Sequence, residues 1–98
     1  MKLAVVVGQV VSTVKLAGFE QERLLLVDMI DKNGLPEGER LVATDSVGAG
    51  DGEWVLVVSG SAARKTIHSI NGVEAPVDAS VVGIVDEAVV NGKIFYHK

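Results

Sequence analysis

The sequence has no cysteine and few aromatic residues, and each shortage excludes a kind of site. Because none of the 98 residues is cysteine, the chain has neither disulfides nor thiolate metal ligands, which is compatible with the cytoplasm. Aromatic residues make up only 4% of the chain, whereas sites for single-stranded nucleic acid or oligosaccharide depend on exposed aromatic rings. The 13 acidic residues outnumber the 9 Lys and Arg, and the net charge of −4 argues against a nucleic-acid partner.

Long apolar runs are also missing. Charged residues interrupt every apolar run before it reaches the roughly 20 residues of a membrane-spanning helix. The first seven residues, MKLAVVV, combine a basic start with an apolar run. They lack a convincing signal-peptidase site and are better explained as a strand. We therefore expect no membrane partner.

What the chain has in excess is aliphatic surface. Hydrophobic residues make up 48% of it, and 11 glycines raise the apolar share well above the roughly 45–50% of an average domain counted with glycine. A chain of 98 residues has room for one domain, and a domain this small buries only part of its surface. We therefore expect other chains to cover the surplus, so that the protein forms an oligomer.

Short β-branched runs between turn residues predict strands rather than helices. Five strands are expected, at residues 3–15 with a bend at Gly8, and at 23–30, 40–45, 53–59 and 79–85. A hairpin with a two-residue Asn-Gly turn is expected after them, and residues 59–65 are expected to form one helical turn. The predicted fold is all-β: a small five-stranded OB-like barrel (residues 1 to about 85) with one short helical turn and a C-terminal β-hairpin (about 86–98), in a single domain, 1–98.

A loop with three glycines in five positions, Gly48, Gly50 and Gly52, precedes the fourth predicted strand. Phosphate-binding glycine loops instead lead into a helix, whose N-terminal amides hold the anion. A strand follows here, and no Gly-Lys-Ser/Thr motif occurs. The loop is therefore expected to be a tight turn or a place where other backbone approaches closely, including another copy of the same loop.

No set of residues predicts an enzyme, a cofactor or a metal site. His68 and His97 lack ligand-like spacing to each other or to a pair of carboxylates. Ser59 and Ser61 flank Gly60 without the nucleophile elbow of a hydrolase or a nearby histidine. The alternative function is an OB-type binding module for nucleic acid or oligosaccharide, which the acidic charge and the scarcity of aromatic residues disfavour.

Several motifs follow one another along the chain: VVGQVVSTVK at 6–15, LLLV at 24–27, DSVGAG at 45–50, GE at 52–53, VLV at 55–57, GSAAR at 60–64, PVDA at 76–79 and VVGIVD at 81–86. In this order they resemble the EutN/CcmL family, the pentameric vertex proteins of bacterial microcompartment shells. The resemblance departs mainly at 16–21 and 65–74. It implies a homopentameric ring in the cytoplasm that caps the five-fold vertices of a carboxysome-like shell, has hexameric shell proteins as neighbours, and needs no cofactor.

The resemblance also suggests where the ring centre lies. The candidate residues are Val47, Gly48, Ala49, Gly50 and Asp51. If five copies of this loop meet at the axis, bulky side chains would collide there, so the small residues would be selected by symmetry. A solvent-facing β turn is the alternative.

Four residues are candidates for the subunit interface: Asp45, Trp54, Arg64 and Asp78. Arg64 follows a turn of small residues, and it is expected either to reach Asp78 or Asp45 across a subunit boundary or to remain a solvated charge. Trp54 is expected to be a core or interface anchor rather than a platform on which a ligand stacks. The terminal hairpin is a further candidate, because an isolated hairpin is marginally stable and needs a surface to lie on.

Overall fold

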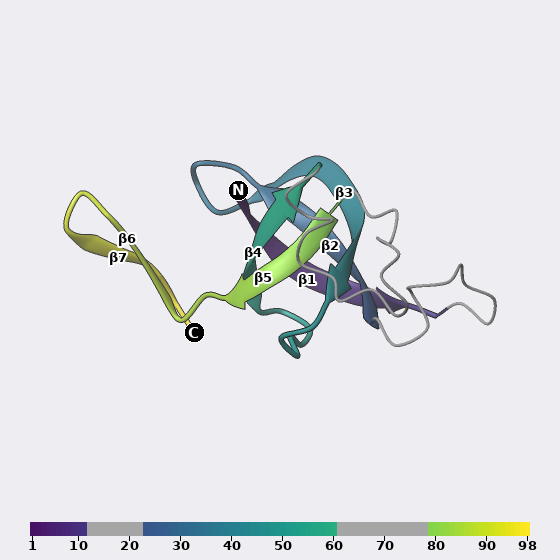
Figure 1. Cartoon of the computed structure of the whole chain (residues 1–98). Coiled ribbons are helices and arrows are strands. Elements are labelled where there is room, and N and C mark those ends of the chain that lie inside the picture. The colour runs from purple at the N-terminus through teal and green to yellow at the C-terminus, as the bar shows by residue number, and fades with distance from the viewer. Residues whose placement is uncertain (12–22, 61–78) are drawn as a thin grey trace.

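The computed structural model describes residues 1–11, 23–60 and 79–98, and every regular element in these ranges is a strand. The strands are β1 (Lys2–Val10), β2 (Arg23–Ile30), β3 (Pro36–Asp45), β4 (Trp54–Ser59), β5 (Ala79–Ile84), β6 (Glu87–Val90) and β7 (Lys93–His97). The first five close a barrel in the order β1-β2-β3-β5-β4, and β6 and β7 form a separate two-stranded sheet (Figure 1). The predicted all-β barrel and hairpin are confirmed. Residues 61–65 of the predicted helical turn lie outside the described ranges.

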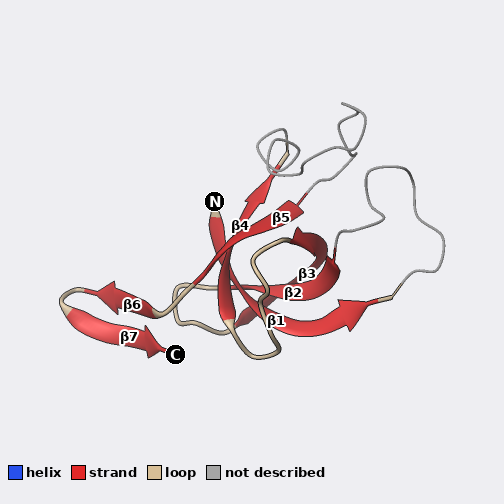
Figure 2. Ribbon diagram, turned by 60° about the horizontal axis from the view of Figure 1, so that its bottom comes forward, coloured by secondary structure: helices blue, strands red, loops and turns tan. Residues whose placement is uncertain are grey.

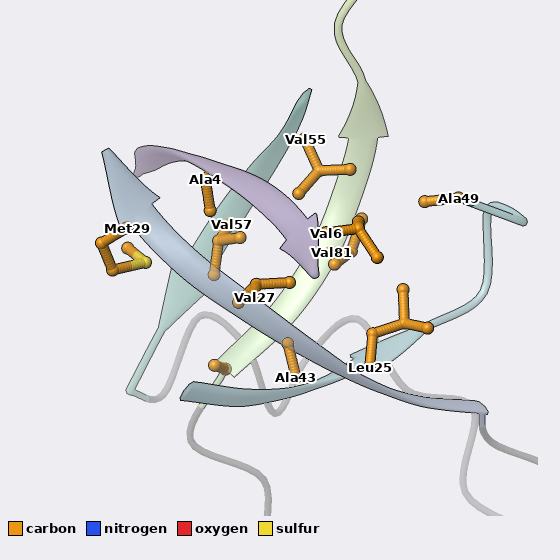
Figure 3. Packing of buried hydrophobic residues seen from close by; sticks show 11 residues of the cluster. Ala4, Val6, Leu25, Val27, Met29, Ala43, Ala49, Val55, Val57 and Val81 are labelled. Atoms are coloured by element: carbon orange, nitrogen blue, oxygen red, sulfur yellow. The ribbon is translucent and has the colours of Figure 1, made fainter. Parts of the chain in front are cut away.

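The core fills the barrel with small aliphatic side chains from alternate strand positions (Figure 3). Along β1 and β4 the burial alternates, as expected for strands with one face toward a core and the other toward the surface. The buried hydrophobic residues are Ala4, Val6, Leu25, Val27, Met29, Ala43, Ala49, Val55, Val57, Ala79 and Val81. Valine and alanine dominate this cluster, so the interior of the barrel is narrow.

The predicted bend at Gly8 is present. Val6 pairs with Val27 of β2 and Gly8 pairs with Leu26, which leaves Val7 as an extra residue in β1. Such a bulge bends a strand and increases its twist. It allows β1 to pair with both β2 and β4 and so to close the barrel.

The third strand begins earlier than the sequence predicted. The Asp31 carboxylate accepts hydrogen bonds from the amides of Asn33 (2.8 Å) and Leu35 (3.1 Å), which completes the turn within a few residues. The turn therefore ends before Pro36, which opposes Ile30 as the first residue of β3. The prediction that β3 begins at residue 40 was wrong, because the Asp31 carboxylate makes the turn tighter than the glycines and proline alone suggest.

The hairpin projects away from the barrel, as both views show (Figures 1 and 2). Its turn residues Asn91 and Gly92 have φ of 53° and 77°, the positive values that a two-residue hairpin turn requires. Near its base, Phe95 and Tyr96 contact Trp54 at the start of β4. The hairpin is thus joined to the barrel by a small aromatic cluster rather than by a broad interface. Within the described ranges there is no helix long and apolar enough to cross a membrane.

The aromatic cluster also needs a glycine in the turn between β2 and β3. A Cβ atom on Gly34 would lie 2.9 Å from Cη2 of Trp54 and 3.2 Å from Cζ of Phe95, whereas a Cβ atom on Gly92 would meet nothing within 4 Å. The two glycines have nearly equal φ, 78° and 77°. We expect Gly34→Ala to lower the free energy of unfolding by at least about 1 kcal/mol more than Gly92→Ala, because only the former adds overpacking to backbone strain. Urea unfolding at one protein concentration measures the difference, and equal losses would contradict it.

Candidate functional site

The loop between β3 and β4 is held at its start by a buried carboxylate. Asp45, the last residue of β3, is 2% exposed. Its Oδ1 accepts hydrogen bonds from the amides of Val47 (3.0 Å) and Gly48 (3.2 Å), and its Oδ2 accepts one from Ala49 (3.0 Å). Arg23 of β2 donates from Nη1 to Oδ2 at 3.1 Å and balances the charge. One side chain therefore fixes the first half of the loop.

The second half of the loop is held by Glu53. Its Oε1 accepts the Gly50 amide at 2.6 Å, and its own amide donates to the Gly50 carbonyl at 3.1 Å. The Gly52 amide donates to the carbonyl of Val6 in β1 at 2.8 Å. The amides of residues 47–50 already have carboxylate acceptors within the chain, so a phosphate could bind them only by displacing Asp45 and Glu53.

The loop presents only some of its residues to the surface. Val47 is 43% exposed, and Gly48, Asp51 and Gly52 are also exposed. Ala49 is 1% exposed and belongs to the core, where Figure 3 shows it on the inner side of the loop. Packing inside the subunit therefore accounts for the small size of Ala49 without any ring symmetry.

Glycine occupies positions 48, 50 and 52 of the loop for different structural reasons. Gly48 and Gly52 have φ of 85° and 82°. Residues other than glycine rarely adopt this backbone conformation. A Cβ atom on either would meet nothing within 4 Å, so both leave open space beside them. Gly50 is different, because a Cβ atom there would lie 3.4 Å from Oε1 of Glu53. Turn geometry thus explains two of the glycines, and the space beside them is free for another chain.

Trp54 anchors the hairpin of its own chain. Its ring stacks on Tyr96, with centroids 4.1 Å apart and planes at 11°, and it forms a T-shaped contact with Phe95, with centroids 5.8 Å apart and planes at 64°. The Tyr96 hydroxyl accepts a hydrogen bond from the Trp54 amide at 3.4 Å. The sequence left a core or an interface anchor open for Trp54, and the structure shows an anchor between barrel and hairpin.

An ion pair ties the end of the hairpin to the loop. The Lys98 ammonium lies 2.7 Å from Oε2 of Glu53, whose side chain is 21% exposed. The hydrogen bond from Lys98, and then that from the Gly50 amide, holds the pKa of Glu53 below its ordinary value. The same pairing raises the pKa of Lys98. Both groups therefore stay charged near neutral pH.

The predicted interface residues separate into two groups. Asp45 and Trp54 make their observed contacts within the subunit, with Arg23 and with the hairpin aromatics respectively. Arg64 and Asp78 lie outside the described residues, so their predicted pairing stays a prediction. The sequence did not point to four residues that hold the loop and the hairpin: Arg23, Glu53, Tyr96 and Lys98. Only the strand register, which sets Arg23 opposite Asp45, would have pointed to any of them.

Metal and cofactor sites were not expected. In residues 1–11, 23–60 and 79–98, no three or more His, Cys, Asp and Glu side chains are grouped so that they could hold a metal ion. No ligand role was predicted for His68 or His97. His68 falls outside these ranges, and His97 lies in β7.

Known proteins resemble the chain over its full length. The bacterial microcompartment shell vertex protein EutN of Salmonella typhimurium is 55% identical over 98 residues, which span 100% of this chain and 96% of that protein. A solved structure of an ethanolamine utilization protein, EutN, superposes with a TM-score of 0.89 at 53% identity and covers 100% of this chain and 99% of its own. The GrpN pentameric microcompartment shell protein from Rhodospirillum rubrum gives a TM-score of 0.78 at 41% identity, over 93% of this chain and 100% of its own.

The matched family is described as ethanolamine utilisation protein EutN/carboxysome, and the match spans residues 1–86. It therefore includes the whole barrel and the loop that Asp45 and Glu53 hold, and it ends where the hairpin begins. The resemblance found in the motifs and the barrel found in the structure agree with it. The chain belongs to the EutN/CcmL family.

Proposed function

We propose that this chain is a structural shell protein, five copies of which close into a ring that caps the five-fold vertices of a bacterial microcompartment. The observation that carries the proposal is full-length identity of 55% to a protein named as a shell vertex protein. A structural neighbour named as a pentameric shell protein supports the subunit number. The role is structural rather than enzymatic, and the protein resides in the shell within the cytoplasm.

The outer surface of the barrel supports ring formation. A closed ring with one kind of contact needs two different patches on each subunit. Two outward rows of apolar residues cross the strands: Gly8, Leu26 and Val42 over β1-β2-β3, and Leu3, Leu56 and Gly83 over β1-β4-β5. Because β2 lies across the barrel from β4 and β5 in the strand order, the two rows face different directions.

Each of these rows places a leucine beside a glycine. Gly83 has its Cβ position 3.4 Å from Cδ1 of Leu56, and Gly8 has its Cβ position 3.7 Å from Cδ1 of Leu26. The glycine lets the leucine side chain lean across its backbone, which gives a low, smooth apolar surface on which another subunit can pack closely. We assign these two rows to the contacts between neighbouring barrels in the ring.

The ring centre is assigned to the exposed part of the glycine loop. Val47, Gly48 and Asp51 can reach a neighbouring copy, with Gly50 behind them, whereas Ala49 contributes through the core. Arg64 and Asp78 remain a proposed pair across the boundary, and Asp45 and Trp54 act on the interface indirectly by holding the loop and the hairpin. Hexameric shell proteins are the proposed neighbours of the ring, since flat sheets of hexamers need pentagonal units to enclose a volume.

Native mass spectrometry tests the subunit number directly. At micromolar concentration we expect a stable five-subunit species, because each copy then covers both apolar rows. A monomer whose mass shifts when single-stranded nucleic acid is added would contradict the proposal and favour a binding module. A monomer that binds nothing would also contradict it.

A bulky side chain at the loop tip tests the ring centre. Val47 is 43% exposed and Leu35, in the turn between β2 and β3, is 61% exposed, so tryptophan fits at either position within one subunit. We expect Val47→Trp to weaken assembly at least about tenfold, or about 1.4 kcal/mol, because five indole rings would meet at the axis. Leu35→Trp is the control and is expected to leave the five-subunit species intact. Pentamers of equal stability in both variants would refute the axial position.

The buried carboxylate gives a prediction about the subunit itself. We expect Asp45→Asn to lower the free energy of unfolding by about 2–3 kcal/mol, since an amide leaves at least one loop N–H and the Arg23 charge without their acceptor. Asp51→Asn makes the same chemical change at an exposed site of the same loop and is expected to cost less than about 0.5 kcal/mol. Urea unfolding of both variants measures the two changes in the free energy of unfolding. Similar losses of stability in the two variants would show that the Asp45 charge does not organise the loop.

A further inference from the structure

We propose that Glu53 couples the position of the hairpin to the shape of the glycine loop. Its two carboxylate oxygens bind two segments that are far apart in the chain. Oε2 lies 2.7 Å from the Lys98 ammonium at the end of the hairpin, and Oε1 accepts the Gly50 amide at 2.6 Å. Together the two contacts make Glu53 a positioning residue for both segments.

The hairpin end is fixed tightly enough to transmit movement. The Lys98 amide donates to the Asp86 carbonyl at 2.9 Å, so the backbone of Lys98 moves with the base of the hairpin. One residue from Glu53, the Trp54 amide donates to the Tyr96 hydroxyl at 3.4 Å and the two rings stack. A rotation of the hairpin about its base therefore displaces both Glu53 and the residue after it.

A displacement of the hairpin is expected to affect only the second half of the loop, after Ala49. The amides of residues 47–49 are held by Asp45, which has its own counter-ion in Arg23 and makes no described contact with the hairpin. Only Gly50 depends on Glu53 through its side chain. Displacing the hairpin should thus release the Gly50 amide and leave the amides before it protected.

The charges that face Glu53 make the link insensitive to physiological pH. Lys98 is its direct partner, and Asp86 and Tyr96 lie near enough to raise the pKa of Lys98 further. Because the pKa of Glu53 is lowered, its contribution is lost only in acid below the ordinary titration range of a glutamate, and because the pKa of Lys98 is raised, its contribution is lost only in alkali above the ordinary range of a lysine. Between those limits the coupling responds to contacts on the hairpin, not to protons.

A consequence follows for the shell and rests on the proposed function. The hairpin projects from the barrel and exposes Val89 (56%), Val90 (50%) and Ile94 (63%), while the loop is assigned to the ring centre. A neighbouring chain that pulls or presses on the hairpin would then alter the loop at the axis. Glu53 would be the point through which the outside of the ring affects its centre.

Amide hydrogen exchange on the assembled protein tests the coupling. Lys98→Met removes the ammonium, and Lys93→Met makes the same change at an exposed position of β7 as the matched control. We expect Gly50 to exchange at least about threefold faster in Lys98→Met, with residues 47–49 unchanged and with Lys93→Met like the parent protein. Unchanged exchange at Gly50 in Lys98→Met would overturn the proposal, as would equal acceleration of the amides at 47–49.

A second variant separates coupling from general loosening. Glu53→Gln keeps an oxygen for the Gly50 amide but removes the charge that holds Lys98. Because the ion pair is lost here too, we expect the Gly50 and Lys98 amides both to exchange at least about threefold faster, with residues 47–49 unchanged; an unchanged Gly50 amide would overturn the proposal. Exchange and native mass spectrometry are independent: a pentamer without coupling refutes only this inference, whereas coupling in a monomer refutes only the proposed function.

Discussion

The barrel closes through a seam that is only two residue pairs long, and Asp45 lies in it. In the described part of the chain, β3 and β5 pair only through Thr44 with Ser80 and Asp45 with Val81, and they do so in parallel. The backbone of Asp45 thus completes the barrel, while its side chain holds the loop amides of residues 47–49. The closure of the fold and the shape of its proposed contact loop depend on the same residue. A buried carboxylate is tolerated there because four donors, three amides and Arg23, satisfy it.

Residue size decides which side of the barrel carries the apolar surplus. The core consists mainly of valine and alanine, with Leu25 as its only leucine among the described residues. Leucines at positions 3, 24, 26 and 56 instead lie at strand positions that alternate with the buried ones and are partly exposed. A narrow five-stranded barrel has no interior room for them. The excess of hydrophobic residues seen in the composition is therefore a property of the outer surface, where a ring of copies can cover it.

Strand positions could be predicted from the sequence, whereas the contacts that hold the loop could not. Runs of β-branched residues, the glycine in the first strand and the Asn91-Gly92 turn each act through local backbone preference, and local preference is visible in a single sequence. The Arg23 and Asp45 side chains are 22 positions apart, and the Lys98 and Glu53 pair spans most of the second half of the chain. Such pairs depend on strand register and on how the hairpin leaves the barrel. The burial of Ala49 could not be predicted for a similar reason, because it depends on the end of the barrel that the side chain fills and not on the local sequence.

The two leucine rows on different sides of the barrel have a consequence for how a ring is completed. Any open arc of subunits leaves one uncovered row at each end, so each copy added to it makes one contact while it loses the freedom of a separate molecule. The last copy makes two contacts for the same loss, because the joint that closes the ring recruits no further molecule. Partial arcs are therefore the least favoured species, and the protein should pass between free subunits and finished rings in a nearly all-or-none manner.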